Sequence, residues 1–322
     1  MTIEPGTRML KADAAAIDTA AACLAAGGLV AFPTETVYGL GADARNGEAV
    51  ARLYAAKGRP AFNPLIAHVA DIDTARRLGR FDETAERLAA AFWPGPLTLV
   101  LPKRSDCPVA DLACAGLDSI AIRVPAHPIA RALLKAFAGP IVAPSANRSG
   151  HVSPTSAAHV LGDLRGRIDM VLDGGPCTVG LESSIVALLG EPTLLRPGGV
   201  PRDDIERVLG KRLAVAVDDN EVPLAPGMLA SHYAPKAKLR LNADVAAPGE
   251  ALLGFGPAPN ATLNLSPTGD LIEAAAKLFS HLRALDASGT ASIAVMKVPD
   301  EGLGEAINDR LKRAAAPRTG RD

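Results

Sequence analysis

The feature that most constrains the fold of this chain is a regular alternation of helix-like and strand-like segments, closely punctuated by Gly and Pro. An Ala-rich helix is expected from about Asp13, and Gly27 and Gly28 give it a typical end signal. A short apolar strand follows at residues 29–32, which Pro33 stops. Such alternation is typical of proteins in which helices cover a buried sheet. The sequence therefore predicts the α/β class.

Further strands are expected at residues 65–69, 97–101, 119–124, 141–143, 170–172 and 184–188. The segment 119–124 is the most informative, because its even-numbered positions are apolar while Ser119 and Arg123 share the opposite face. Between the first strands, Asn46 is expected to cap a helix that Gly58 ends in the left-handed conformation. This arrangement places Lys57 at a helix C-terminus.

The length of 322 residues predicts two domains. Residues 222–235 are punctuated by Pro and lack periodicity, which is typical of a linker. Beyond them, strands at 252–255 and 293–298 and helices at 271–285 and 303–315 predict a second, smaller α/β unit. We therefore expect a catalytic domain at 1–210, a linker at 211–236 and a C-terminal domain at 237–322.

Composition excludes several classes of protein. Lys and Arg number 34 against 35 Asp and Glu, so no global positive field attracts nucleic acid, and 3% aromatic residues disfavour base stacking. Four Cys without a C-x-x-C pair indicate neither a disulfide framework nor a zinc site. The N-terminus lacks a secretion signal and the longest uncharged stretch, 251–269, contains Pro and Gly, so a cytoplasmic protein without a membrane span is expected.

Polar and basic side chains gather in small-residue loops beside the expected strands and helices. Four cations lie in or next to them, namely Lys57, Arg59, Arg123 and Arg196. If they meet in one cleft, their mutual repulsion favours a polyanionic ligand, since an arginine fork matches phosphate or carboxylate oxygens. Taken singly, Lys57 also fits a helix-end cation, and Arg123 fits an ion pair on the sheet face.

Three other patterns have competing explanations. Ser153 followed by Pro154 fits a helix N-cap as well as it fits a contact with ATP. His68 on a strand is commonly a buried core histidine. Residues 39–44 match a loose G-x-G-x-x-A dinucleotide pattern, but they do not directly follow the strand, and no acidic residue stands about 20 positions on to hold a ribose.

Five motifs together point to one family. They are Phe-Pro-Thr-Glu-Thr-Val-Tyr-Gly-Leu-Gly at 32–41, Lys-Gly-Arg at 57–59, Asn-Pro-Leu at 63–65, Ser-Ala-Asn at 145–147 and Glu-Ser-Ser-Ile-Val at 182–186. This combination resembles the YrdC-type domain of threonylcarbamoyl-AMP synthases over residues 12–210. Ser-His-Tyr-Ala-Pro at 231–235 is similar to the joint in the long, two-domain form of that family. Ser184 stands where Thr is frequent, and it keeps the hydroxyl.

The resemblance implies a twisted open mixed sheet with a positively lined concave cavity, joined by a linker to a smaller C-terminal α/β domain. It implies a nucleotidyltransferase that makes L-threonylcarbamoyladenylate and pyrophosphate from L-threonine, bicarbonate or CO2, and ATP. Mg²⁺ is expected to accompany ATP, without a metal site made of protein ligands. The product is expected to pass to the machinery that transfers threonylcarbamoyl to tRNAs reading A-starting codons.

The resemblance also implies roles for individual residues. Lys57 and Arg59 are the expected catalytic pair and face the phosphates. The other expected ATP contacts are Asn63, Ser119, Ser145, Asn147, Ser153, Arg196, His232 and Tyr233. The expected L-threonine contacts are Thr36, His68, Arg123, Ala143 and Ser183.

The linker has an expected use as a lid that keeps water from hydrolysable intermediates, with His232 and Tyr233 near the nucleotide. Two other functions stay open. One is a non-catalytic RNA-binding or regulatory YrdC-type module, which the balanced charge and scarce aromatics disfavour. The other is carbamoyl transfer from carbamoyl phosphate, as in hydrogenase-maturation proteins, whose zinc-binding cysteines this chain lacks. Direct contact with tRNA is left undecided.

Overall fold

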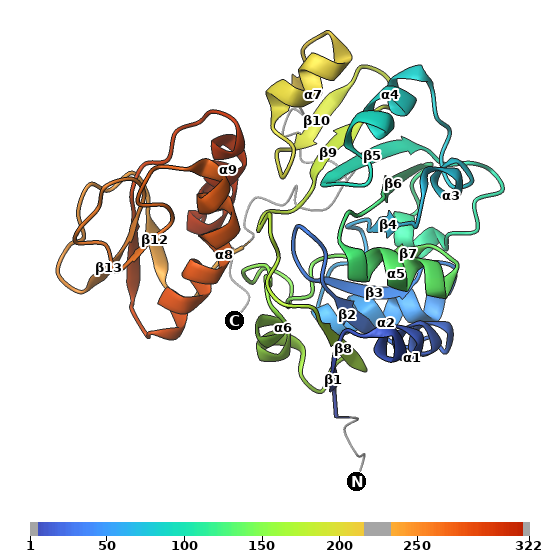
Figure 1. Cartoon of the computed structure of the whole chain (residues 1–322), viewed down its shortest axis with the longest axis horizontal. Coiled ribbons are helices and arrows are strands. Elements are labelled where there is room, and N and C mark those ends of the chain that lie inside the picture. The colour runs from blue at the N-terminus through green and yellow to red at the C-terminus, as the bar shows by residue number, and fades with distance from the viewer. Residues whose placement is uncertain (1–5, 216–232, 318–322) are drawn as a thin grey trace.

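The computed structural model describes residues 6–215 and 233–317, which form a large mixed sheet and a small parallel sheet, each with its own helices (Figure 1). The expected α/β class, with a smaller second α/β unit, is confirmed. His232 and most of the expected lid lie outside the described residues, so their placement stays a prediction.

The large sheet mixes parallel and antiparallel pairs. In spatial order its described strands are β1 (Arg8–Lys11), β8 (Met170–Asp173), β2 (Val30–Phe32), β3 (Gly39–Asp43), β7 (Ile141–Val142), β4 (Ile66–His68), β6 (Ser119–Arg123), β5 (Leu97–Pro102), β9 (Ser184–Ala187), β10 (Thr193–Arg196) and β11 (Ala214–Val215). Strands β4 and β6 are parallel, with His68 opposite Arg123. Because both strands end there, these two polar side chains lie at the same edge of the sheet.

Helices cover both faces of the large sheet. They are α1 (Ala14–Ala25), α2 (Gly47–Lys57), α3 (Ile72–Arg76), α4 (Glu83–Phe92), α5 (Pro128–Phe137), α6 (Ala157–Leu164) and α7 (Arg202–Leu209), with a 3₁₀ turn at Asp111–Cys114. Val30 and Phe32 share a hydrophobic cluster with α1 and α5, whereas Ala31 shares one with α2, α4, α6 and α7. Successive strand residues point to opposite faces, so these clusters lie on opposite sides of the sheet.

Local signals in the sequence predicted α2 correctly. The Asn46 side chain accepts hydrogen bonds from the backbone N–H groups of Glu48 and Ala49 at 3.0 and 3.1 Å. Gly58 ends the helix with φ +60°, a left-handed conformation that favours glycine. Lys57 is therefore the last helical residue, as expected.

One loop interpretation needs correction, and one rejected pattern can now be explained. The helix N-cap is Ser156, whose Oγ accepts from His159 N, so the interpretation of Ser153 as the N-cap is wrong. Residues 39–43 form strand β3, antiparallel to β2, which agrees with the rejection of a dinucleotide-binding turn there. A Cβ on Gly41 would lie 2.9 Å from Phe32 and 3.0 Å from Ile141, so this glycine serves close packing.

The small sheet is entirely parallel. Its strands, in spatial order, are β12 (Lys238–Arg240), β15 (Ser292–Val295), β13 (Glu250–Gly254) and β14 (Leu263–Asn264), and its helices are α8 (Leu271–Ala287) and α9 (Leu303–Ala315). The predicted helix at 303–315 matches α9 residue for residue. In the described segments, every helix is too short or too polar to cross a membrane.

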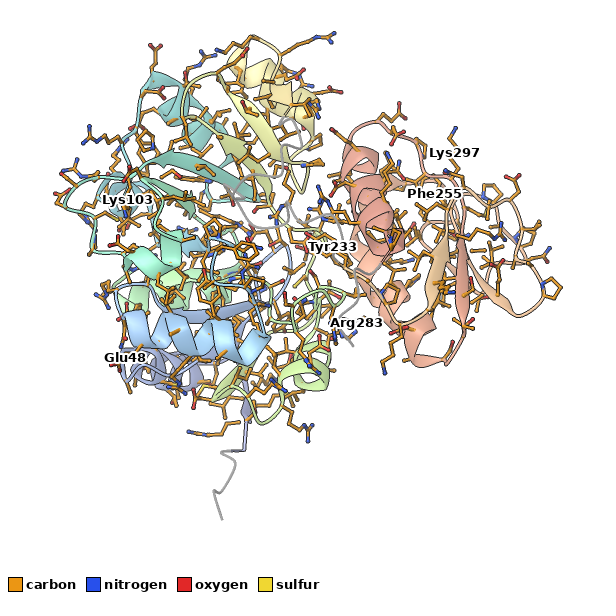
Figure 2. All side chains as sticks on the ribbon, turned by 180° about the vertical axis from the view of Figure 1, so that it is seen from behind. Glu48, Lys103, Tyr233, Phe255, Arg283 and Lys297 are labelled. Carbon is orange, nitrogen blue, oxygen red and sulfur yellow. The ribbon has the colours of Figure 1, made fainter. Side chains whose placement is uncertain are left out.

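Helices α8 and α9 pack against the loops of the large unit (Figures 1 and 2). Val37, Val152 and Leu181 from the large unit join the hydrophobic cluster of the small one. The approach is close, because a Cβ on Gly180 would lie 2.5 Å from the carbonyl oxygen of Ala275. The two units therefore meet through packed apolar groups as well as through charges.

This contact predicts the effect of Gly180→Ala. The substitution should cost roughly 1–2 kcal/mol for an alanine with φ above zero and a further ~1–3 kcal/mol for the collision with α8. Gly210→Ala is the matched control, because Gly210 has a similar φ of +70° and a methyl group added there would meet no atom within 4 Å. Thermal unfolding should show a larger loss for Gly180→Ala, and equal losses would contradict the close approach.

Candidate active site

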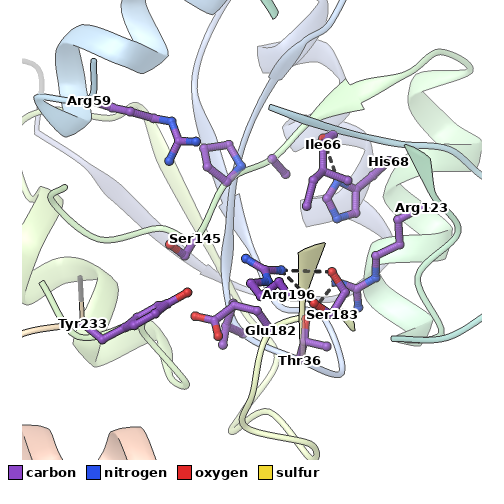
Figure 3. A pocket seen from close by; sticks show the side chains of 13 residues that line it. Thr36, Arg59, Ile66, His68, Arg123, Ser145, Glu182, Ser183, Arg196 and Tyr233 are labelled. Atoms are coloured by element: carbon purple, nitrogen blue, oxygen red, sulfur yellow. Dashed lines mark hydrogen bonds between the residues drawn. The ribbon is translucent and has the colours of Figure 1, made fainter. Parts of the chain in front are cut away.

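Nine of the predicted site residues meet in one cavity between the ends of β4 and β6 and the surrounding loops (Figure 3). The hollow between these side chains has a volume of about 480 Å³, part of which is open to solvent. The predicted residues that line it are Thr36, Arg59, His68, Arg123, Ala143, Ser145, Ser183, Arg196 and Tyr233. The lining also includes Glu182, which the sequence reasoning did not select.

Five predicted residues do not line this cavity, namely Lys57, Asn63, Ser119, Asn147 and Ser153. Lys57 lies behind the wall and donates from Nζ to the carbonyl oxygens of Ser145 and Asn147, each at 2.5 Å. Ser119 begins β6 at the end opposite Arg123, roughly 13 Å away along the strand. Of the four cations expected to meet, Arg59, Arg123 and Arg196 line the cavity. Lys57 lies behind its wall.

Arg123 is oriented by Glu35, which belongs to the 32–41 motif but was not selected as a site residue. Its Nη2 donates to Glu35 Oε1 at 2.5 Å, and its Nη1 donates to Thr36 Oγ1 at 2.9 Å. Glu35 Oε2 accepts from the backbone N–H groups of Ala126 and His127. Burial alone would raise the pKa of Glu35, but the charge of Arg123 and its hydrogen bond hold that pKa below the usual range. The ion pair considered for Arg123 therefore exists, and it holds the guanidinium at the cavity.

His68 is neutral and has a defined tautomer. Its Nδ1 lies 3.1 Å from the Ile66 carbonyl oxygen, which only accepts, so Nδ1 carries the proton and Nε2 is the acceptor nitrogen. Burial, followed by the nearby charge of Arg123, lowers its pKa to about 3. The side chain is buried like a core histidine, and it also lines the cavity.

Arg196 and Ser183 form a second oriented group. Arg196 donates to the Ser183 carbonyl oxygen from Nε at 3.2 Å and from Nη2 at 2.9 Å (Figure 3). The Ser183 hydroxyl lies 2.7 Å from the hydroxyl of Thr98, a residue that no loop motif indicated. Ser184 points elsewhere and bonds with both backbone groups of Val200. The guanidinium therefore braces the segment that presents Ser183.

Lys57 and Arg59 are buried cations whose described hydrogen bonds go to main-chain carbonyl groups. Arg59 donates to the carbonyl oxygens of Asn63 and Pro64 at 3.3 and 3.0 Å. Neither cation forms an ion pair with any described Asp or Glu. Burial is the main reason that the pKa of Lys57 falls well below its usual value and that of Arg59 falls to about 10. An incoming anion would relieve this cost.

Known proteins match this chain over nearly its whole length. The family described as Telomere recombination matches residues 22–198, and the family described as Threonylcarbamoyl-AMP synthase, C-terminal domain, matches residues 200–316. The chain is 43% identical to the threonylcarbamoyl-AMP synthase of Pyrococcus abyssi, with 94% of each chain covered. It is 42% identical to that of Bacillus subtilis, over 94% of this chain and 93% of the relative.

The chain belongs to the threonylcarbamoyl-AMP synthase family. Its function is that of a threonylcarbamoyl-AMP synthase, an enzyme of the transferase class. The structure agrees, because the crystal structure of P. abyssi Sua5 complexed with L-threonine has a TM-score of 0.88 at 40% identity, with 96% of each chain covered. The family resemblance expected from the five motifs is therefore confirmed.

The neutral state of His68 predicts how this synthase responds to acid. The pKa of His68 is about 3 when folded, below the ordinary 6.5, so the unfolded chain binds the extra proton as pH falls below 6.5. The stability of wild type relative to His68→Gln should therefore drop by about 2 kcal/mol between pH 7 and pH 5. Urea unfolding at both pH values measures this, and a pH-independent difference would show that His68 is not held neutral.

Gly198 predicts how tightly the Ser183 segment is held. A Cβ there would lie 2.4 Å from the Glu182 carbonyl oxygen and 2.4 Å from Ser184 N, both backbone atoms. Gly198→Ala should displace this segment and lower the rate of threonylcarbamoyl-AMP formation by about a hundredfold. Gly190→Ala is the control, since its added methyl group would meet no atom within 4 Å. Equal rates for the two variants would contradict the prediction.

Proposed function

We propose that this chain joins L-threonine, bicarbonate or CO2, and ATP into L-threonylcarbamoyladenylate, and that it is a nucleotidyltransferase. The amine of L-threonine captures the carbon as a carbamate, with loss of water when bicarbonate is used. A carbamate oxygen then bonds to the α-phosphorus, and the bond from that phosphorus to the β-phosphate bridge breaks to release pyrophosphate. The observation that carries the proposal is one cavity lined by both an oriented Arg123–His68 pair and the buried cation Arg59.

The β4–β6 end of the cavity suits L-threonine. Arg123, fixed by Glu35, offers a cation to the amino acid carboxylate, and His68 Nε2 offers an acceptor to its ammonium or hydroxyl group. Thr36 and Ser183 supply hydroxyl groups, and Ala143 supplies backbone, as the family resemblance implies. Because His68 is neutral, it does not repel the amine that has to react.

The opposite side of the cavity suits ATP. Arg59 lines this side of the cavity and Lys57 lies behind its wall, so phosphate charge bound there would compensate both cations, helped by Arg196 and Ser145. The side-chain oxygens of Asn63 and Asn147 are buried and accept no hydrogen bond from the described residues, which suits donors of the ribose or the base. Ser153 lies beside Glu182, and Ser119 contacts the nucleotide if ATP extends along β6.

The arrangement supports catalysis by positioning and charge. Carbamate attack on phosphorus requires no nucleophilic side chain, and cations stabilise the charge that develops on the leaving pyrophosphate. Among the described residues, no group of three or more His, Cys, Asp or Glu is arranged to hold a metal. In this proposal Mg²⁺ accompanies ATP as part of the ATP complex, bound by the phosphates.

The proposal includes the wider organisation of the chain. Residues 1–210 form the catalytic domain, 211–236 the linker and lid, and 237–322 the C-terminal domain, although β11 continues the large sheet to Val215. Tyr233 lines the cavity, which supports a lid that closes over the nucleotide. The product passes to a transferase that modifies tRNA, and the reaction takes place in the cytoplasm.

One assay tests the chemistry. Purified protein with ATP, Mg²⁺, L-threonine and bicarbonate should yield L-threonylcarbamoyladenylate, detected by mass, together with pyrophosphate. Product with serine but not threonine would show that the substrate is wrong. Salt-dependent RNA binding without ATP turnover would instead favour the non-catalytic module.

The same assay tests the two buried cations. Lys57→Ala and Arg59→Ala should each lower pyrophosphate release at least about a hundredfold, because each removes charge from the phosphate site. Lys135→Ala is a matched control, since Lys135 also lies in the last turn of a helix but is exposed. Circular dichroism checks that the variants fold. Wild-type rates in folded Lys57→Ala and Arg59→Ala would contradict the assigned roles.

A further inference from the structure

Arg310 of α9 reaches from the C-terminal unit into the wall of the cavity. Its side chain is fully buried, and its Nε donates to Glu182 Oε2 at 2.8 Å. Its Nη1 donates to the carbonyl oxygen of Pro197 at 2.9 Å and to Asp309 Oδ2 at 2.6 Å. The guanidinium also lies 5.2 Å from the centre of the Tyr233 ring, which lines the cavity. One arginine therefore contacts three segments around the site.

Glu182 connects Arg310 to other residues of the site through its own hydrogen bonds. Its Oε1 accepts from Ser153 Oγ at 2.5 Å, and its carbonyl oxygen accepts from Gly199 N at 2.9 Å. The next residue is Ser183, whose carbonyl group is held by Arg196. Fixing the Glu182 carboxylate therefore fixes the hydroxyl of Ser153 and the start of the segment that presents Ser183.

The contact between Arg310 and Glu182 also changes the net charge of the cavity wall. Glu182 is a buried carboxylate that lines a cavity proposed to receive triphosphate, and an unpaired carboxylate there would repel the ligand. Burial alone would raise the pKa of Glu182, but the charges of Arg310 and then Arg196 outweigh it and lower that pKa. The carboxylate is therefore ionised and compensated mainly by a residue from the other unit.

We propose that Arg310 is a positioning residue for adenylate formation, which neutralises Glu182 and thereby makes the C-terminal unit part of the ATP site. This inference rests on the proposed function. It assigns the C-terminal unit a direct role in the cavity wall, distinct from anchoring a lid.

A second ion pair between the two units provides a control, which distinguishes a positioning role of Arg310 from a role in holding the units together. Arg202 of α7 donates to Glu305 of α9, and both side chains are partly exposed. Neither residue lines the cavity. Arg202→Met and Arg310→Met therefore make the same chemical change in two arginines that join the same pair of units, and only one of them contacts Glu182.

The test measures the KM for ATP, kcat and direct ATP binding in the full chain. Arg310→Met should raise the KM and the dissociation constant for ATP at least about tenfold, whereas Arg202→Met should change them less than about twofold. Arg310→Lys keeps the charge but not the two-sided fork, so it should fall between Arg310→Met and wild type. It also provides a measurement if Arg310→Met does not fold.

Adding Glu182→Gln to Arg310→Met should recover most of the lost ATP affinity, because no unpaired carboxylate remains. A merely structural role would not give this rescue. The inference is overturned if the folded Arg310 variants match Arg202→Met, or if Glu182→Gln restores nothing. Wild-type protein that makes no threonylcarbamoyl-AMP would contradict the proposed function itself, whereas active wild type with an unaffected Arg310→Met contradicts only the role of Arg310.

Discussion

The burial of charged side chains is the constraint on which the rest of this structure depends. A buried charge is costly unless another charge or several hydrogen bonds compensate it, and this chain uses both means. Arg123 and Arg310 meet carboxylates, namely Glu35 and Glu182. Lys57 and Arg59 meet main-chain carbonyl groups instead. The first pair is electrically satisfied, and the second keeps its attraction for anions.

This division of charge explains how one cavity can treat two substrates differently. A compensated arginine beside a neutral His68 makes a directional site, which suits a zwitterion whose amine has to stay reactive. Uncompensated cations make a site whose attraction grows with the negative charge of the ligand, which suits phosphates. Main-chain hydrogen bonds join the loops that carry these groups, because Leu40 N donates to the Pro144 carbonyl oxygen at 2.7 Å and Ala146 N donates to the Tyr38 carbonyl oxygen at 2.8 Å. The loop with Glu35 and Thr36 is therefore tied to the loop with Ser145 and Asn147.

Much of the fold followed from local patterns in the sequence. The caps of α2, the two faces of β6 and the bounds of α9 depend on residues within a few positions of one another, and each matched its prediction. Strand β3 was not among the expected strands, because its glycines are unusual in a strand and are explained by close packing against Phe32 and Ile141. Nine residues selected from the sequence line the cavity. Glu35 and Glu182 lie inside two of the motifs but were not selected as site residues, and Thr98 lies outside every motif. All three matter through their partners.

The α/β class, the family and the polar loops could be predicted from the amino-acid sequence alone. Periodicity, helix caps and motifs each depend on residues that are close together in the chain. The tertiary structure alone decided which charges are paired. Glu182 and Arg310 are 128 residues apart, and Glu35 and Arg123 are 88 apart, so no local pattern links them. Which distant charges become partners depends on how the sheets and helices pack. This packing pairs Arg123 and Arg310 with carboxylates and leaves Lys57 and Arg59 without one among the described residues.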